Sequence, residues 1–72
     1  MFRSMETGFQ ITFENGVTVS VQWGRGTYAT PPHTAEVGAW YQHELGADWI
    51  DEVMGWQTPD EVAAYIEEIR NL

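Results

Sequence analysis

The feature that most constrains this fold is a pair of alternating segments separated by Asn15-Gly16. Every second side chain is apolar in residues 9–13, and again in residues 17–23. Period-2 alternation of β-branched and aromatic side chains is typical of strands that bury one face. The two segments therefore predict an antiparallel β-hairpin with one apolar face.

The length of the connecting loop decides whether the two apolar sets share that face. A two-residue turn at Asn15-Gly16 would set Phe13 opposite Thr18, and residues directly opposite each other lie on the same face. A three-residue loop instead pairs Phe13 with Val17 and keeps the apolar side chains together. We expect the three-residue loop, with a type I turn and Gly16 in the left-handed region as a G1 bulge.

The segments after the hairpin predict further parts of a sheet. Residues 24–34 form an expected loop, because they contain two glycines and a Pro-Pro pair. Residues 35–42 predict a third strand, and residues 43–48 a turn. The segment 49–56 is open to two interpretations, a short fourth strand ending near residue 54 or a single helical turn.

The C-terminal segment predicts a helix with a defined start. Thr58 is a suitable N-cap, Pro59 suits the first helical position, and Glu61 completes a T-x-x-E capping box. Apolar side chains then recur at helical spacing and predict one stripe that packs on the sheet: Val62, Tyr65, Ile66, Ile69 and Leu72. We expect one α+β domain over residues 1–72, in which one C-terminal helix covers a three- to four-stranded antiparallel sheet.

The size of the chain limits how such a domain can be stabilised. A domain of 72 residues is near the lower limit for folding alone, and without cysteine it has neither disulfides nor Cys-based zinc sites. Stability must come from aromatic packing, for which the chain has four Trp, three Tyr and three Phe, or from self-association. The absence of cysteine fits a cytoplasmic protein, and no apolar run is long enough for a signal peptide or a membrane span.

The charge of the chain is strongly acidic and unevenly placed. Eleven acids against three Arg give a net charge of −8, which excludes nucleic acid and anionic membranes as direct partners, since binding phosphate needs cations. Nine of the acids lie between Gly26 and Ile69, where there is no Lys or Arg. They form either a solvated face that only keeps the protein in solution, or an anionic surface that docks on a basic groove of another protein.

The candidate partner-binding surface combines these acids with nearby tryptophans, because Trp and Tyr anchor many binding surfaces. Two alternatives remain open. The tryptophans could seal the edges of a small core, or they could form a homodimer contact. The residues predicted to bind a protein with a basic surface are Glu44, Asp48, Trp49, Asp51, Glu52, Trp56, Asp60, Glu67 and Glu68.

A second candidate site is the loop Gly24-Arg25-Gly26-Thr27-Tyr28. Backbone N–H groups next to glycine, an Arg, a hydroxyl and an aromatic ring could together hold an anion, although a flexible turn has the same composition. His33 and His43 lie ten residues apart with no metal-ligand spacing, and no Ser or Cys nucleophile has a recognisable setting. We therefore expect no enzyme activity, no cofactor and no metal.

Residues 11–28, ITFENGVTVSVQWGRGTY, resemble a group of small uncharacterised bacteriophage and prophage proteins with the pattern ITFxNGxTVSVQ(W/F)GxGxY. The resemblance implies a phage-linked origin. By analogy with other small phage proteins, it implies a counter-defence role in the host cytoplasm. One form of that role is an anti-CRISPR-like inhibitor that binds a host protein engaging nucleic acid. Another is an oligomeric sponge for a nucleotide signal, and a third possibility is a minor virion component.

Overall fold

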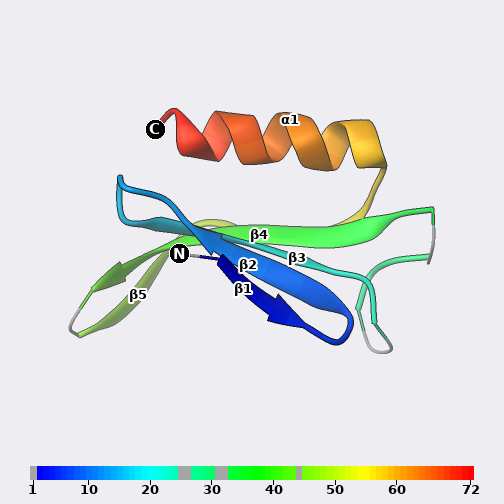
Figure 1. The fold of residues 1–72 in the computed structure, drawn as a ribbon, viewed down its shortest axis with the longest axis horizontal. Helices are drawn as coiled ribbons and strands as arrows, with labels where there is room; N and C mark the ends of the chain where they lie inside the picture. Colours follow the sequence, from blue (N-terminus) through cyan, green and yellow to red (C-terminus); the bar gives the residue numbers. More distant parts are fainter. Residues whose placement is uncertain (1, 25–26, 31–32, 44) are drawn as a thin grey trace.

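The computed structural model describes residues 2–24, 27–30, 33–43 and 45–72. The described chain forms a five-stranded antiparallel sheet in which each strand pairs with the next along the sequence, and one helix that crosses one face of the sheet (Figure 1). The strands are β1 (Phe2–Met5), β2 (Gly8–Thr12), β3 (Val17–Gln22), β4 (Ala35–His43) and β5 (Gly46–Gln57), and the helix is α1 (Pro59–Arg70).

The α+β class and the single C-terminal helix are confirmed, but the predicted number of strands was too small. The additional strand is β1, which pairs with β2 from Phe2 opposite Ile11 to Met5 opposite Gly8. β5 is also longer than the predicted fourth strand, since it has 12 residues. Only residue 45 of the predicted 43–48 turn is described as a turn, because the flanking residues pair across the β4–β5 hairpin.

The three-residue hairpin loop is confirmed. Ile11 lies opposite Val19 and Thr12 opposite Thr18, as that loop length requires. The N–H of Phe13 donates to the carbonyl of Val17 at 3.0 Å, and the N–H of Gly16 donates to the carbonyl of Phe13 at 3.0 Å. Gly16 has a φ of 84°, which is the left-handed conformation of a G1 bulge. The apolar sets of β2 and β3 therefore share one face.

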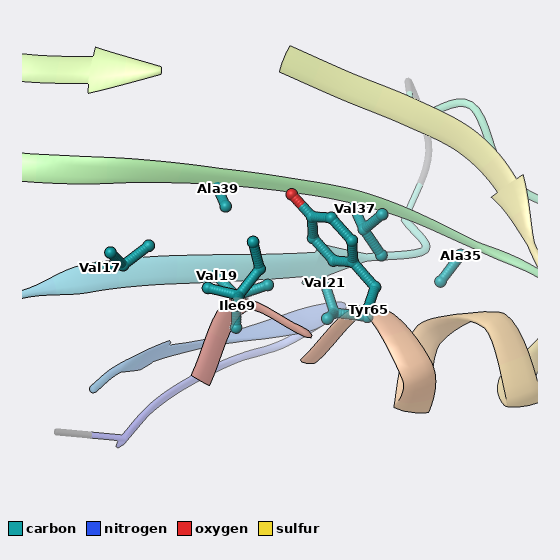
Figure 2. Close-up of a cluster of buried hydrophobic side chains, with 8 residues drawn as sticks. All are labelled: Val17, Val19, Val21, Ala35, Val37, Ala39, Tyr65 and Ile69. Atoms are coloured by element: carbon teal, nitrogen blue, oxygen red, sulfur yellow. The ribbon is translucent and has the colours of Figure 1, made fainter. Parts of the chain in front are cut away.

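That face is covered by α1, and the core lies between them (Figure 2). The helix packs against β3, β4 and β5. The residues of this buried cluster are Val17, Val19, Val21, Ala35, Val37, Ala39, Tyr65 and Ile69. Phe9, Ile11 and Phe13 were also predicted for the core but are only partly buried, because the helix packs against β3, β4 and β5 rather than β2. Ile66 of the helix is likewise only partly buried.

The predicted capping box of α1 is confirmed. The N–H of Glu61 donates to the hydroxyl of Thr58, and the N–H of Thr58 donates to the carboxylate of Glu61 at 2.9 Å. The predicted apolar stripe extends one residue too far, because Leu72 lies beyond the helix and is 62% exposed. Within the described part of the chain, no helix has the length and apolar character that crossing a membrane requires.

The segment 49–56 is strand, and the alternative of a helical turn is wrong. Its pairing with β4 is irregular, since Ala39, Val37 and Ala35 lie opposite Asp51, Met54 and Gln57. From one pair to the next, β4 advances by two residues and β5 by three. β5 therefore has one extra residue each time, which is the definition of a β-bulge. These bulges allow a 12-residue strand to pair with a nine-residue one.

Candidate protein-interaction surface

The predicted residues of the 48–56 segment all belong to β5, which is an edge strand. β4 pairs with β5 on one side, and no strand of the described chain pairs with it on the other. Trp49 is 52% exposed and Trp56 is 58% exposed, while Asp48 and Glu52 are also exposed. An edge strand with large exposed apolar side chains is a site where another chain can pair. Glu44 lies outside the described residues.

Trp49 and Trp40 form a pair on the face of the sheet that α1 leaves uncovered. They lie opposite each other in the β4–β5 register, and Trp40 lies opposite Thr18, whose neighbours in β3 face the helix. The two ring centroids are 5.2 Å apart in an edge-to-face arrangement. This pairing leaves Trp49 half exposed rather than buried, so its indole is accessible to a partner.

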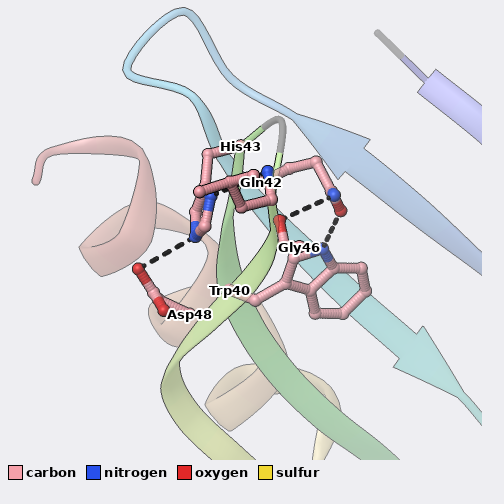
Figure 3. A network of polar contacts seen from close by, with 6 residues as sticks. Trp40, Gln42, His43, Gly46 and Asp48 are labelled. Atoms are coloured by element: carbon pink, nitrogen blue, oxygen red, sulfur yellow. Dashed lines mark hydrogen bonds and ion pairs between the residues drawn. The ribbon is translucent and has the colours of Figure 1, made fainter.

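The end of the β4–β5 hairpin is held by polar side chains (Figure 3). The Trp40 indole N–H donates to the Gln42 amide oxygen at 3.3 Å, and the Gln42 amide N–H₂ donates to the carbonyl of Gly46 at 3.0 Å. Nε2 of His43 lies 3.1 Å from Oδ2 of Asp48. The Asp48 side chain is still 79% exposed, so this contact leaves most of its surface in solvent.

Trp56 and Tyr28 form a second exposed aromatic pair, at the other end of β5. Their ring centroids are 5.5 Å apart, and the Trp56 N–H donates to the carbonyl of Tyr28 at 2.8 Å. Trp56 has a φ of 52°, which for a residue other than glycine costs about 1–2 kcal/mol. Residues with a strained backbone conformation are concentrated at functional sites, where the surrounding structure holds them in place. The strain marks Trp56 as the most unusual of the predicted residues.

Asp51 is directed toward the helix rather than to solvent. The phenolic O–H of Tyr65 donates to Oδ2 of Asp51 at 3.1 Å. Burial, this hydrogen bond and the negative charges of Asp51 and Glu68 raise the pKa of Tyr65 well above its ordinary value. Asp51 therefore lies at the junction of β5 and α1, whereas Glu68 is a neighbour of Tyr65 on the helix itself.

The remaining predicted acids lie on the helix, and they do not all face the same direction as the acids of β5. Glu61 is used in the capping box, and hydrogen bonds from Thr58 lower its pKa. Glu67 is two residues from the buried Tyr65, which places it about 200° around the helix and away from the sheet. Asp60 lies in the first turn and is exposed. The predicted acids therefore do not form one surface, since Glu67 lies on the outer face of the helix.

The predicted anion loop is described only in part, because Arg25 and Gly26 lie outside the described residues. The N–H and the hydroxyl of Thr27 both donate to the carbonyl of Gly24. The N–H of Tyr28 donates to Oε2 of Glu36 at 2.7 Å. Both of these backbone donors therefore have acceptors within the protein, and one of the acceptors is a carboxylate. Among the described residues, no group of three or more His, Asp or Glu side chains is placed to hold a metal.

Comparison of the chain with models of protein families, with curated proteins and with solved structures gives no match in any of the three. Sequence reasoning found the exposed tryptophans from their number and type, but it did not find Glu36, Gly38 and the glutamines that face Trp49 across the uncovered side of the sheet, since only the strand register brings them together.

Proposed function

We propose that this chain is a small non-catalytic inhibitor of phage type, which binds a host defence protein through the β5 side of its sheet. The observation that carries this proposal is the exposure of Trp49 and Trp56 on an edge strand that also presents Asp48 and Glu52. Large aromatic side chains supply contact area, and surrounding charges select the partner. The β5 surface is defined here as Asp48, Trp49, Glu52 and Trp56, which are all exposed.

The charge of this surface supports a basic partner. The described cationic side chains are Arg3, on the opposite edge strand β1, and Arg70, in the last turn of α1, so the β5 surface contains none. A host protein that engages nucleic acid has a basic groove, and an acidic protein competes for it by the same electrostatic attraction. The resemblance of residues 11–28 to phage and prophage proteins supports a host defence protein as the partner class.

The same charge acts against a homodimer through β5. A two-fold symmetric contact brings the same residues of both chains together. The exposed acids Asp48 and Glu52 would therefore approach the same acids of the second chain. Like charges placed together destabilise such a contact. The homodimer stays a prediction, which light scattering of the purified protein tests.

Affinity purification from host cells, followed by reconstitution with the purified candidate partner, tests the proposed function. Glu52→Lys reverses one charge on the β5 surface, and Glu67→Lys makes the same change on the outer face of α1. We expect Glu52→Lys to lose the partner and Glu67→Lys to retain it. Equal retention by both variants would contradict a role for the β5 surface.

The nucleotide sponge remains the alternative proposal, centred on Gly24, Arg25, Gly26, Thr27 and Tyr28. The nearby carboxylate of Glu36, which accepts the Tyr28 N–H, acts against an anion at this loop. A thermal-shift screen with cyclic and ADP-ribose-type nucleotides tests it. A ligand present at ~100 times its dissociation constant would add about 2.7 kcal/mol of stability, and no shift with any nucleotide would remove the alternative.

A further inference from the structure

The uncovered face of the sheet contains a cavity of about 230 Å³, which is lined by residues of β2, β3, β4 and β5. Its base is formed by Ser20 of β3 and Gly38 of β4, which lie opposite each other in the register. The indoles of Trp40 and Trp49 line one side, and the polar side chains of Gln10, Gln22 and Glu36 are also among its lining residues. The cavity therefore combines aromatic surface with polar groups.

The position of the Trp49 ring in this cavity depends on the absence of a side chain at Gly38. A Cβ atom added to Gly38 would lie 3.3 Å from Cζ3 of Trp49, which is closer than ordinary van der Waals contact. Glycine therefore allows the Trp49 ring to lie against the backbone of β4, where the ring meets Trp40 edge-to-face. The half-exposed indole is left facing the cavity and solvent.

The polar lining offers acceptors. Oε2 of Glu36 accepts the Tyr28 N–H, which orients its carboxylate, and no cation of the described chain pairs with it. Nε2 of Gln22 donates to the Ser20 hydroxyl at 3.1 Å, so the amide oxygen is the part of Gln22 left to accept. The amide of Gln10 has no hydrogen-bond partner within the described residues, and its oxygen can also accept.

We infer that this cavity binds the guanidinium group of an arginine side chain from the partner, an inference that rests on the proposed function. A guanidinium is planar and stacks on an indole, while its five N–H donors match carboxylate and amide oxygens. The net charge of −8 favours a cation over an anion. An apolar side chain would leave the Glu36 carboxylate and the glutamine amides without partners in a covered site, which is unfavourable.

Arginine fits this cavity better than lysine. The ammonium group of lysine is a compact, strongly hydrated charge that neither stacks flat on a ring nor presents a planar set of donors. Arg3 is the one described cation on this face, and it lies on β1 opposite Gln10, exposed and outside the lining residues. The cavity itself therefore has no cation of its own within the described chain.

Titration with Nα-acetyl-arginine N-methylamide, followed by the indole N–H signals in NMR spectra of the whole protein, tests the inference. The probe has one charge, on its guanidinium. We expect saturable shifts of two indole signals, which Trp40→Phe and Trp49→Phe assign. The citrulline analogue has nearly the same shape without the charge, and should bind at least about ten-fold more weakly. Equal binding of the citrulline or lysine analogue would overturn the assignment to arginine.

Glu36→Gln tests the carboxylate without removing the acceptor for Tyr28, and Glu67→Gln makes the same change of charge far from the cavity. We expect about a ten-fold loss of affinity for the arginine probe in the first variant and no change in the second. Equal affinity in both would overturn the inference. If the probe does not bind while the protein still captures a basic partner in a salt-dependent way, this inference fails and the proposed function stands.

Discussion

The phenolic oxygen of Tyr65 lies 3.1 Å from Oδ2 of Asp51, so the helix is joined directly to the edge strand that carries the β5 surface. Tyr65 is buried at the centre of the core, whereas Asp51 is partly exposed on β5. The hydrogen bond therefore connects core packing with the position of the edge strand. It also removes one of the predicted partner-binding carboxylates from free contact with solvent.

Tyr65→Phe should destabilise the protein by about 1 kcal/mol, because it removes this hydrogen bond and keeps the ring. The pKa of Tyr65 is raised in the folded state, so its contribution is complete below the unfolded-state value near 10 and is lost as the pH rises toward the folded-state value. Urea unfolding at a series of alkaline pH values measures this. Tyr65→Phe should lose stability less steeply than the parent protein, and the exposed Tyr41→Phe should behave as the parent.

A second long-range contact joins the hairpin loop to the end of the helix. The amide nitrogen of Asn15 donates to the carbonyl of Ile69 at 3.0 Å and is also close to those of Arg70 and Leu72, while its oxygen accepts the Val17 N–H at 2.9 Å. The last carbonyls of a helix lack donors from a further helical turn, and the Ile69 carbonyl accepts the Leu72 N–H at 3.2 Å in addition to the Asn15 amide. One side chain thus stabilises both the G1-bulge loop and the helix C-terminus.

Asn15→Ala should therefore lower the free energy of unfolding by about 0.5–2 kcal/mol, if the loss resembles that of an N-cap side chain. Thermal or urea unfolding measures the change. Asn71→Ala is the matched control, since Asn71 is exposed and its capping contacts are made by its backbone N–H. The control should stay within about 0.5 kcal/mol of the parent protein. A similar loss in both variants would contradict the role given to Asn15.

The capping box makes the free energy of unfolding depend on pH in the acid range. Hydrogen bonds from Thr58 lower the pKa of Glu61, so its contribution is present above the unfolded-state pKa and is lost as the pH falls through the folded-state pKa. Glu61→Gln should therefore weaken the acid dependence of unfolding below about pH 5, with Glu67→Gln as the matched control. Unfolding midpoints at a series of pH values measure this, and identical pH profiles of the two variants would speak against the capping contact.

Sequence reasoning found the elements whose signals are local. The capping box and the alternation of residues 9–13 and 17–22 depend on neighbouring residues alone, and both are confirmed. β1 was missed because four residues are too few to show alternation. The length of β5 was missed because its bulges place Asp51, Met54 and Gln57 on one face at a spacing of three, which resembles helical rather than strand periodicity.

The candidate site was predictable only in its parts. The tryptophans and acids of 48–56 were predicted from type and charge to be exposed and to bind a partner, and the structure exposes Trp49 and Trp56. The contact of Asp51 with Tyr65 depends on how α1 lies over the sheet, for which a single sequence carries no signal. The cavity beside Trp49 likewise depends on the register of three strands.

The salt dependence of partner binding tests the central claim most directly. Once a partner is purified, its dissociation constant is measured by calorimetry from about 50 mM to about 300 mM NaCl, for the parent protein and for Trp49→Ala. Our account predicts that the dissociation constant rises at least about ten-fold over this range, and that Trp49→Ala weakens binding at every salt concentration. A dissociation constant that does not change with salt, or full affinity in Trp49→Ala, would contradict binding through the β5 surface.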